Sequence, residues 1–342
     1  MNFNGDSGAR SDRFSIRDNV FFQMPIPIPD IDEQRKIGEL LTCLDNLIAL
    51  HQRKYDKLTN VKKSMLEKMF PKNGSNVPEI RFKGFTEAWE QRKLDELVDV
   101  CSGRDYKHLS EGTIPVYGTG GYMLSVNDAL SYDRDAIGIG RKGTIDRPYI
   151  LKAPFWTVDT LFYAIPREKV DLNFAFDIFQ NIDWKKKDES SGVPSLSRTA
   201  INEIHILVPQ YDEQQVLGQL FYGIDRLIAL HQRKLDKMKE LKKAFLNLIF
   251  SQKLRFYGFT DSWELRKLEE VAPLRGGYAF QSNQYANEGI PIVRISNILS
   301  DGSVGGEFVF HNELKDDEIF MLENGDIVLA MSGATTGKVS IL

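Results

Sequence analysis

The sequence is poor in cysteine and histidine, the residues of disulfide frameworks and of thiolate or imidazole metal centres. Its 342 residues include only two cysteines, Cys43 and Cys101, and five histidines. The two cysteines have no spacing typical of metal ligands or of a disulfide framework. No apolar run approaches the roughly 18 residues that a membrane-spanning helix needs, and the first residues lack the apolar segment of a secretory signal. We therefore predict a protein of the reducing cytoplasm, with no metal site and no membrane contact.

The chain also lacks an excess of basic residues. Lysine and arginine number 44 against 48 aspartates and glutamates, so the formal net charge is −4. This total gives no support for nucleic-acid binding, although it does not exclude a local basic surface. A hydrophobic content of 42% and a charged content of 27% are typical of globular proteins. The length leaves room for two domains.

What the sequence does contain is a long duplicated unit. Residues 32–70 align with residues 212–250, and both copies include the unbroken octamer LIALHQRK. A second duplicated block follows each copy of the first, at 81–97 and 255–271, with the shared pattern RF-x-GF-T-x-x-W-E-x-RKL. Two copies of so long a unit are too few for a solenoid or a propeller. The duplication predicts internal two-fold pseudosymmetry.

Each copy of the first block has the pattern of a long amphipathic helix. Acidic residues follow a proline at each start, where the helix dipole favours negative charge. Apolar positions then recur every three or four residues, which is typical of a heptad seam. The seam positions are Ile37, Leu41, Leu44, Ile48, His51 and Tyr55 in the first copy and Leu217, Phe221, Ile224, Ile228, His231 and Leu235 in the second. We predict an antiparallel coiled coil, and packing or helix register is favoured over metal binding for the two histidines.

The remaining segments predict β-rich domains. Short strand-like runs alternate with Gly, Asn, Asp and Ser turns in the long segment between the helices. The C-terminal segment begins with a similar pattern, and the N-terminal residues resemble the end of the complete domain. We predict an α+β protein made of a split-domain fragment (1–30), a first helix with its linker (31–76), a complete domain (77–210), a second helix (211–254) and the other split-domain fragment (255–342). The split domain has no counterpart of residues 152–190, so we expect it to be incomplete.

Sequence motifs for cofactors are weak. Residues 138–143 match GxGxxG, but a proline and β-prone residues follow them rather than a helix. Residues 333–338 resemble a phosphate-binding loop that is one residue short and lacks the following Ser or Thr. Turns are the favoured interpretation of both. With no catalytic constellation either, we predict that the chain is not an enzyme and binds no cofactor itself.

Basic residues on loops are the candidate functional residues. Arginine can read guanine edges, and lysine or serine can hold phosphates. In the complete domain the candidates are Arg104, Lys107, Arg141, Lys142, Arg147, Lys185, Lys186, Lys187, Ser195 and Arg198. In the split domain they are Arg275, Arg294, Lys338, Arg10, Arg13 and Arg17. Each alone is more often a solvated charge, but their clustering in equivalent loops of two related domains favours DNA binding.

These motifs together resemble those of the specificity subunits of type I restriction-modification systems. The resemblance rests on P-x-x-DEQ before the LIALHQRK helix, on the RF-x-GF-T-x-x-W-E-x-RKL pattern and on GDIVLAMSGATTGK near the C-terminus. It implies two target recognition domains joined by antiparallel helices, each domain reading one half of a bipartite site in double-stranded DNA. It also implies methyltransferase (modification) subunits as partners, and restriction subunits through them. Those partners would use S-adenosylmethionine, ATP and magnesium.

The split domain departs from the family pattern and leaves alternatives open. The chain is a permuted subunit whose ends fold together, a truncated or silent cassette product, or a chain that needs a partner or self-associates. A coiled-coil scaffold without DNA binding is the alternative function, and an enzyme that binds a nucleotide at the glycine turn is a third.

Overall fold

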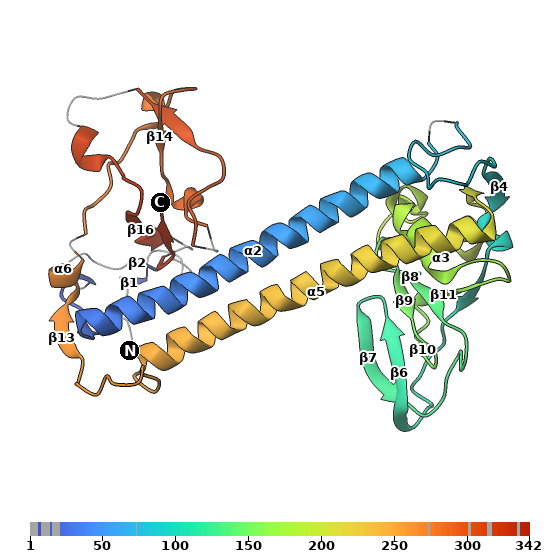
Figure 1. The fold of residues 1–342 in the computed structure, drawn as a ribbon, viewed down its shortest axis with the longest axis horizontal. Helices are drawn as coiled ribbons and strands as arrows, with labels where there is room; N and C mark the ends of the chain where they lie inside the picture. The colour runs from blue at the N-terminus through green and yellow to red at the C-terminus, as the bar shows by residue number, and fades with distance from the viewer. Residues whose placement is uncertain are drawn as a thin grey trace. The chain divides into compact units, whose positions relative to one another are not determined.

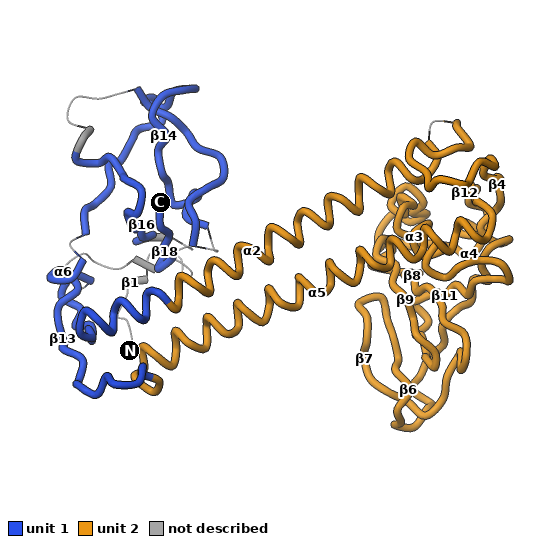
Figure 2. The backbone as a smooth tube through the Cα atoms, in the orientation of Figure 1, with its two compact units in different colours: residues 1–39, 255–342 blue, residues 40–254 orange. Residues whose placement is uncertain are grey.

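The chain forms two compact units, which are coloured in Figure 2. The computed structural model describes residues 6–7, 14–15, 21–72, 74–272, 274–299, 302–312, 317–333 and 336–342. Unit 1 comprises residues 1–39 and 255–342, and unit 2 comprises residues 40–254. The expected mixture of helices and sheets is confirmed (Figure 1). No helix in the described residues is long and apolar enough to cross a membrane. The two units do not by themselves test the five predicted segments, which stay a prediction.

Two long helices carry the duplicated sequence. Helix α2 spans Ile31–Met69 and α5 spans Tyr211–Phe250. Helix α2 stops just before Pro71, whose ring cannot continue a helix. Helix α5 stops before Gln252, which has a left-handed φ of 58°, a conformation that commonly ends helices. The amphipathic pattern and these stop signals therefore place both helices where the repeat predicts them.

Within unit 2 the two helices run antiparallel. Three side-chain contacts between them define the register, and the residue number in α5 falls as that in α2 rises. The contacts are Asp45 with Lys242, His51 with His231 and Lys62 with Asp225. His51 and His231 are repeat counterparts, so their contact lies on the local two-fold axis of the pair.

The seam positions line this helix pair. All of the predicted seam residues on α2 and α5 are buried or half-buried, whereas neighbouring apolar residues such as Leu47 and Leu227 are exposed. Phe221 and Leu235 are among the most buried side chains of α5. Full burial of such a side chain contributes about 1.5–3 kcal/mol. The 3.5-residue period of the sequence thus identifies the buried stripe.

The histidine contact predicts that stability falls in acid. The two Nδ1 atoms lie 3.0 Å apart, so one ring donates to the other and an added proton would place two donors face to face. Burial lowers the pKa of His231, and the charges of His51, Lys54 and Lys234 lower it further. The folded pKa therefore lies below the unfolded value of about 6.5. The stabilisation is complete above pH ~6.5 and is lost as the pH falls through the folded pKa.

Urea unfolding at pH about 7.5 and about 5.5 checks this prediction. The His231→Gln variant should lose part of the pH dependence, because glutamine does not titrate. Equal pH dependence in the two proteins would contradict it.

Unit 2 carries a β-rich domain between the helices. Its main sheet is antiparallel with strand order β5-β11-β8-β9, and a second sheet has order β10-β6-β7. The main-sheet strands are β5 (Val98–Ser102), β8 (Ala136–Gly140), β9 (Tyr149–Leu151) and β11 (Leu161–Pro166). The second sheet contains the hairpin β6 (Glu111–Gly118) and β7 (Gly121–Val126), with β10 (Trp156–Thr157) parallel to β6. Short helices complete the domain: η1 (Leu94–Glu96), α3 (Leu172–Asn181), η2 (Trp184–Lys187) and α4 (Arg198–Asn202).

Aromatic residues join this domain to the helix pair. Phe70, directly after α2, stacks on Phe174 of α3 at 5.8 Å between ring centroids and meets Trp89 edge-on at 5.6 Å. Phe221 of α5 completes the group at 6.1 Å from Phe70. Such aromatic pairs stabilise beyond the area that they bury. The core of unit 2 is therefore continuous from the sheet to the helices.

A polar cluster interrupts the seam beside this core. The Nζ atom of Lys62 lies 2.6 Å from both carboxylate oxygens of Asp225 and 2.5 Å from Oε1 of Gln180 on α3. Burial raises the pKa of the neighbouring Asp177 carboxyl well above its usual range, and the charge of Lys62 opposes this shift. A buried charge without its partners is costly. Shifting the helices would separate Lys62 from these groups, so the cluster disfavours other registers.

Gly218 lets α3 approach α5 closely. A Cβ atom at this position would overlap Oδ1 of Asp171 and lie 2.8 Å from the amide of Phe174. Asp171 caps α3 by accepting a hydrogen bond from that amide. We expect Gly218→Ala to lower the free energy of unfolding by about 1–3 kcal/mol through overpacking. The matched variant Gly223→Ala, in open space on the same helix, should raise it by about 0.5–1 kcal/mol. Urea unfolding measures both, and equal effects would contradict the prediction.

The base of the domain is closed by the duplicated motifs. Strand β4 (Glu90–Lys93) pairs antiparallel with β12 (His205–Val208). Beside them, Arg81 donates from Nε and Nη2 to the two carboxylate oxygens of Glu213, at 2.8 and 2.7 Å. The RF-x-GF segment after one helix is thus bound to the DEQ segment that begins the other.

Unit 1 has the same closure at its base. Strand β13 (Glu264–Lys267) pairs antiparallel with β3 (Pro25–Ile28). Arg255 donates to both carboxylate oxygens of Glu33, and the indole of Trp263 donates to Glu33 Oε2 at 3.0 Å. The two motifs therefore play the same structural role in both units.

The rest of unit 1 consists of short elements. The strands are β1 (Asp6–Ser7), β2 (Phe14–Ser15), β14 (Ile290–Ile292), β15 (Val309–His311), β16 (Ile327–Leu329), β17 (Ser332–Gly333) and β18 (Val339–Ile341). The helices are α6 (Leu268–Val271), η3 (Ser282–Gln284), η4 (Ile295–Asn297) and η5 (Asp317–Phe320). Among the described residues β16 pairs with β18 alone, whereas β8 of unit 2 lies between β9 and β11.

Candidate nucleic-acid interface

The end of β10 and the loop that joins it to β11 gather three of the predicted basic residues at one edge of the unit 2 domain. The carbonyl of Thr157 accepts from the amide of Arg104 at 2.9 Å, and the carbonyl of Thr160 accepts from the amides of Arg141 and Lys142 at 2.8 and 3.3 Å. All three basic side chains are exposed. Backbone hydrogen bonds therefore fix their positions while their charges stay in solvent. This arrangement can hold the phosphates of a nucleic acid.

The loop that contains Ser195 joins the same edge. Ser195 forms a β-bridge with Lys142, and the amide of Leu196 donates to the carbonyl of Arg141 at 3.0 Å. Asp188 shapes the loop, because its Oδ1 accepts from the amides of Ser190 and Ser195 at 3.0 and 2.9 Å. The Ser195 and Ser190 amides lower the pKa of Asp188 below its usual value. The structure thus brings together Arg104, Arg141, Lys142 and Ser195.

Other predicted cations of this domain are already paired with acidic groups. Lys185 lies 2.9 Å from Asp146, Lys186 lies 2.9 Å from Asp183, and Arg198 lies 3.3 Å from Asp99. The bond from Lys185 lowers the pKa of Asp146. In each pair the carboxylate weakens the attraction between the lysine or arginine and a phosphate. By contrast, Arg104, Lys107, Lys142 and Arg147 form no ion pair with the residues that the structure describes.

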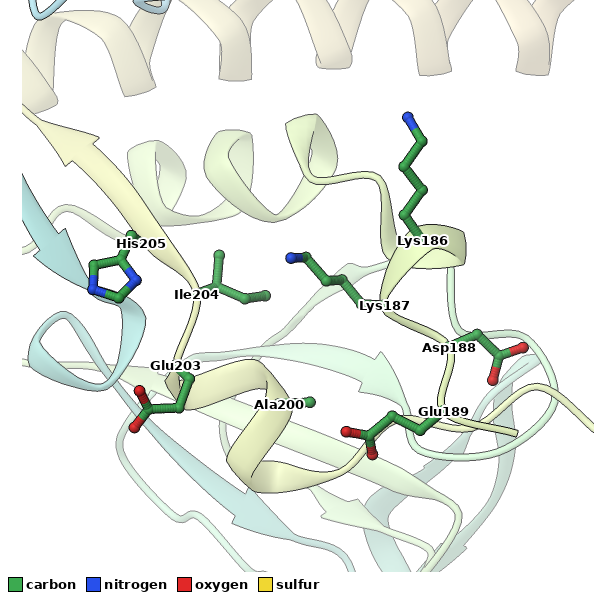
Figure 3. Close-up of a pocket in the computed structure, with 8 residues that line it drawn as sticks. All are labelled: Lys186, Lys187, Asp188, Glu189, Ala200, Glu203, Ile204 and His205. Carbon is green, nitrogen blue, oxygen red and sulfur yellow. The ribbon is translucent and has the colours of Figure 1, made fainter. Parts of the chain in front are cut away.

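Figure 3 shows a pocket beside the lysine run, and its lining residue Asp188 also accepts the hydrogen bond from the Ser195 amide. Its volume is about 570 Å³, and it lies between η2 and the α4–β12 turn. The lining includes Lys187 together with the acidic side chains of Asp188, Glu189 and Glu203. Mixed charge of this kind does not suit an anion such as a phosphate. The pocket therefore adds nothing to the nucleic-acid interface.

The candidates in unit 1 are placed in part. Arg275 is exposed, while Arg294 and Lys338 are half-buried. Arg294 donates to the carbonyl of Glu307 at 3.3 Å. The other candidates, Arg10, Arg13 and Arg17, lie outside the described residues. The role of all six candidates in unit 1 stays a prediction.

Sequence reasoning missed an apolar feature beside the basic edge. Tyr122 and Met123, in the β6–β7 hairpin, are 63% and 49% exposed. The amide of Val158, in the same β10–β11 loop, donates to the carbonyl of Tyr117 at 3.0 Å. The signal in the sequence was the run of uncharged residues from 112 to 127, but a run of this kind is also typical of an ordinary hairpin.

In the described parts of the chain, no three His, Cys, Asp or Glu side chains are grouped as metal ligands would be.

Comparison with known proteins supplies a family context. The family model for the type I restriction modification DNA specificity domain matches residues 7–60, 86–240 and 260–342. The type I restriction enzyme MjaVIII specificity subunit of Methanocaldococcus jannaschii is 25% identical over 276 residues, which cover 69% of this chain and 63% of that protein. The MjaIX specificity subunit of the same organism is 22% identical over 214 residues, covering 56% and 49%.

A solved structure is also similar in part. The S subunit of the type I restriction-modification system from M. genitalium is 18% identical, with a TM-score of 0.45 over 64% of this chain and 60% of that chain. The chain therefore spans less than two thirds of each of these relatives.

Proposed function

Because the chain belongs to the type I restriction modification DNA specificity domain family, we propose that it is a DNA-recognition subunit that binds double-stranded DNA and positions a methyltransferase on it. The observation that carries this proposal is the group of exposed cations on the edge of unit 2, at Arg104, Arg141 and Lys142. Phosphates attract such cations, and arginine in a groove can read guanine. Unit 1 repeats the strand pair and the Arg–Glu ion pair found in unit 2. In the proposal it makes a second contact with DNA, so that the target is bipartite.

In this proposal the chain performs no reaction itself. Modification subunits would use S-adenosylmethionine, and restriction subunits recruited through them would use ATP and magnesium. The site of action is the cytoplasm, because chromosomal and invading DNA are found there. The alternative, a coiled-coil scaffold without DNA binding, has the same helices but makes no use of the cationic edge.

The test is a pair of measurements on the full chain. A gel shift with duplex DNA at low salt should show binding that weakens steeply as salt rises, because bound phosphates release counterions. Co-expression with the modification subunit of its own system, followed by methylation mapping, should show a new bipartite motif. Methylation identical with and without the chain, together with no gel shift, would leave the scaffold as the better account.

The helix pair offers a docking surface for the modification subunits. The duplicated leucines Leu47, Leu50, Leu227 and Leu230 are 36–46% exposed beside the seam. Exposed apolar residues in repeated positions suit helices of a partner protein. We expect Leu47→Glu/Leu227→Glu to weaken capture of the modification subunit at least about tenfold. The gel shift of the isolated chain should not change. Unchanged capture in a pull-down titration would exclude this face.

A further inference from the structure

The tip of the β6–β7 hairpin combines exposed apolar side chains with an absence of charge. Tyr122 and Met123 are adjacent in β7 and largely exposed. No charged residue occurs between residues 112 and 127. A tip without carboxylates can approach the phosphates of DNA without repulsion. Large apolar side chains exposed together usually mark a contact site.

Several contacts support the residues that flank this tip. The ring centroid of Tyr117 lies 6.0 Å from that of Tyr149 and 6.3 Å from that of Tyr122. The hydroxyl of Tyr149 donates to the carbonyl of Gly118 at 2.7 Å. Met123 rests against Gly118, where a Cβ atom would lie 2.8 Å from its sulfur. A side chain that is already ordered loses less entropy when it binds.

The hairpin and the basic residues are both hydrogen-bonded to the same segment of the chain. The β10–β11 loop contacts the hairpin through the bond from Val158 to Tyr117 and contacts Arg141 through Thr160. Thr157, at the end of β10, accepts from the amide of Arg104. The carbonyl of Arg104 also accepts from the indole of Trp156, in the strand that pairs with β6. A duplex whose phosphates contact these cations therefore lies next to the hairpin.

We propose that Tyr122 and Met123 form an apolar wedge that presses into a base-pair step of the bound duplex. The proposal rests on the proposed DNA binding and deepens it. Apolar wedges unstack a step and kink the duplex, and pyrimidine–purine steps deform most easily. The hairpin thereby adds selection by DNA deformability to whatever the loops read directly.

The experiment uses the full chain with its modification subunit and a duplex carrying the mapped target, with 2-aminopurine at each step in turn. Unstacking should raise the fluorescence at one step when the wild-type complex binds. Tyr122→Ala/Met123→Ala should abolish the rise and weaken target binding roughly tenfold. The salt dependence of binding should stay the same, since no cation is removed. Tyr122→Phe should keep the signal, because the ring and not the hydroxyl acts.

Tyr132→Ala is the matched control. Tyr132 is 62% exposed in the same domain, and its hydroxyl bonds to Asp128 rather than packing at the hairpin tip. This variant should behave as wild type. Wild-type binding without a fluorescence rise at any step would overturn the wedge and leave DNA recognition intact. Loss of modification-subunit binding by the double variant, with unchanged DNA fluorescence, would assign the tip to a protein partner. Absence of any DNA binding by the wild type would refute the proposed function itself.

Discussion

Replacing Arg141 and Lys142 together by alanine is expected to weaken DNA binding roughly tenfold to a hundredfold at low salt. Both side chains are exposed, and the Thr160 carbonyl fixes the backbone amides from which they project. The double variant keeps this backbone arrangement, because alanine retains both amides. The loss therefore reports charge rather than a disordered loop. The guanidinium of Arg141 also lies over the ring of Phe162, 5.7 Å from its centroid. This contact limits the rotamers that the Arg141 side chain can adopt.

A titration at several salt concentrations separates this effect from a general change in charge. The slope of log affinity against log salt should become shallower by roughly one for each phosphate contact removed. The control is Lys57→Ala/Lys63→Ala, which removes the same charge from exposed positions on α2. It should leave both affinity and slope nearly unchanged. Similar losses in the two double variants would mean that only overall charge matters, and the edge would no longer be a defined site.

The second large effect concerns stability. Arg81→Ala is expected to lower the free energy of unfolding by about 3–5 kcal/mol, because it leaves a buried carboxylate without its partner. The Glu213 side chain is 2% exposed and that of Arg81 is 11% exposed. The Arg92–Glu90 pair in β4 provides the contrast, with side chains 46% and 71% exposed. An exposed pair of that kind contributes at most about 1 kcal/mol.

Urea unfolding followed by circular dichroism measures the free energy of unfolding of each single variant. Arg81→Ala should shift the midpoint far more than Arg92→Ala. Arg81→Met/Glu213→Leu should recover much of the loss, since removing both charges leaves no unpaired group. A double variant as unstable as Arg81→Ala would show that packing around the guanidinium, and not its charge, holds the base of the domain.

Periodicity explains why the helices could be predicted from the sequence. Ile48, Tyr55, Ile228 and Leu235 are half-buried or buried because each helix turns once every 3.6 residues, and that is a local property. The strands of unit 2 have a different local signal, since β8 is a short run that is buried at every position. A duplicated sequence also implies similar local structure in its two copies.

The candidate interface was less predictable, because it depends on neighbours that are distant in the sequence. Lys185, Lys186 and Arg198 have the residue type expected of DNA contacts, but Asp146, Asp183 and Asp99 lie beside them in the folded chain. The bond between Arg81 and Glu213 joins residues that are 132 positions apart. Its one sequence signal was the joint duplication of both residues. Tyr122 gives no such signal, because its exposure depends on how the β6–β7 hairpin lies in the folded domain.

Adjacent strands mark the entry and the exit of the β-rich domain in unit 2. The chain enters through β4 and leaves through β12, and paired strands are about 4.8 Å apart. Everything between Lys93 and His205 is therefore an insertion carried on a closed stem. Recombination with one crossover on each side could exchange this cassette for another. Arg81, Glu213 and the helical seam would stay as they are. A new cassette would have to keep partners for the helices, such as Phe174 against Phe70, and under the proposed function it would then change the DNA target while the rest of the framework persists.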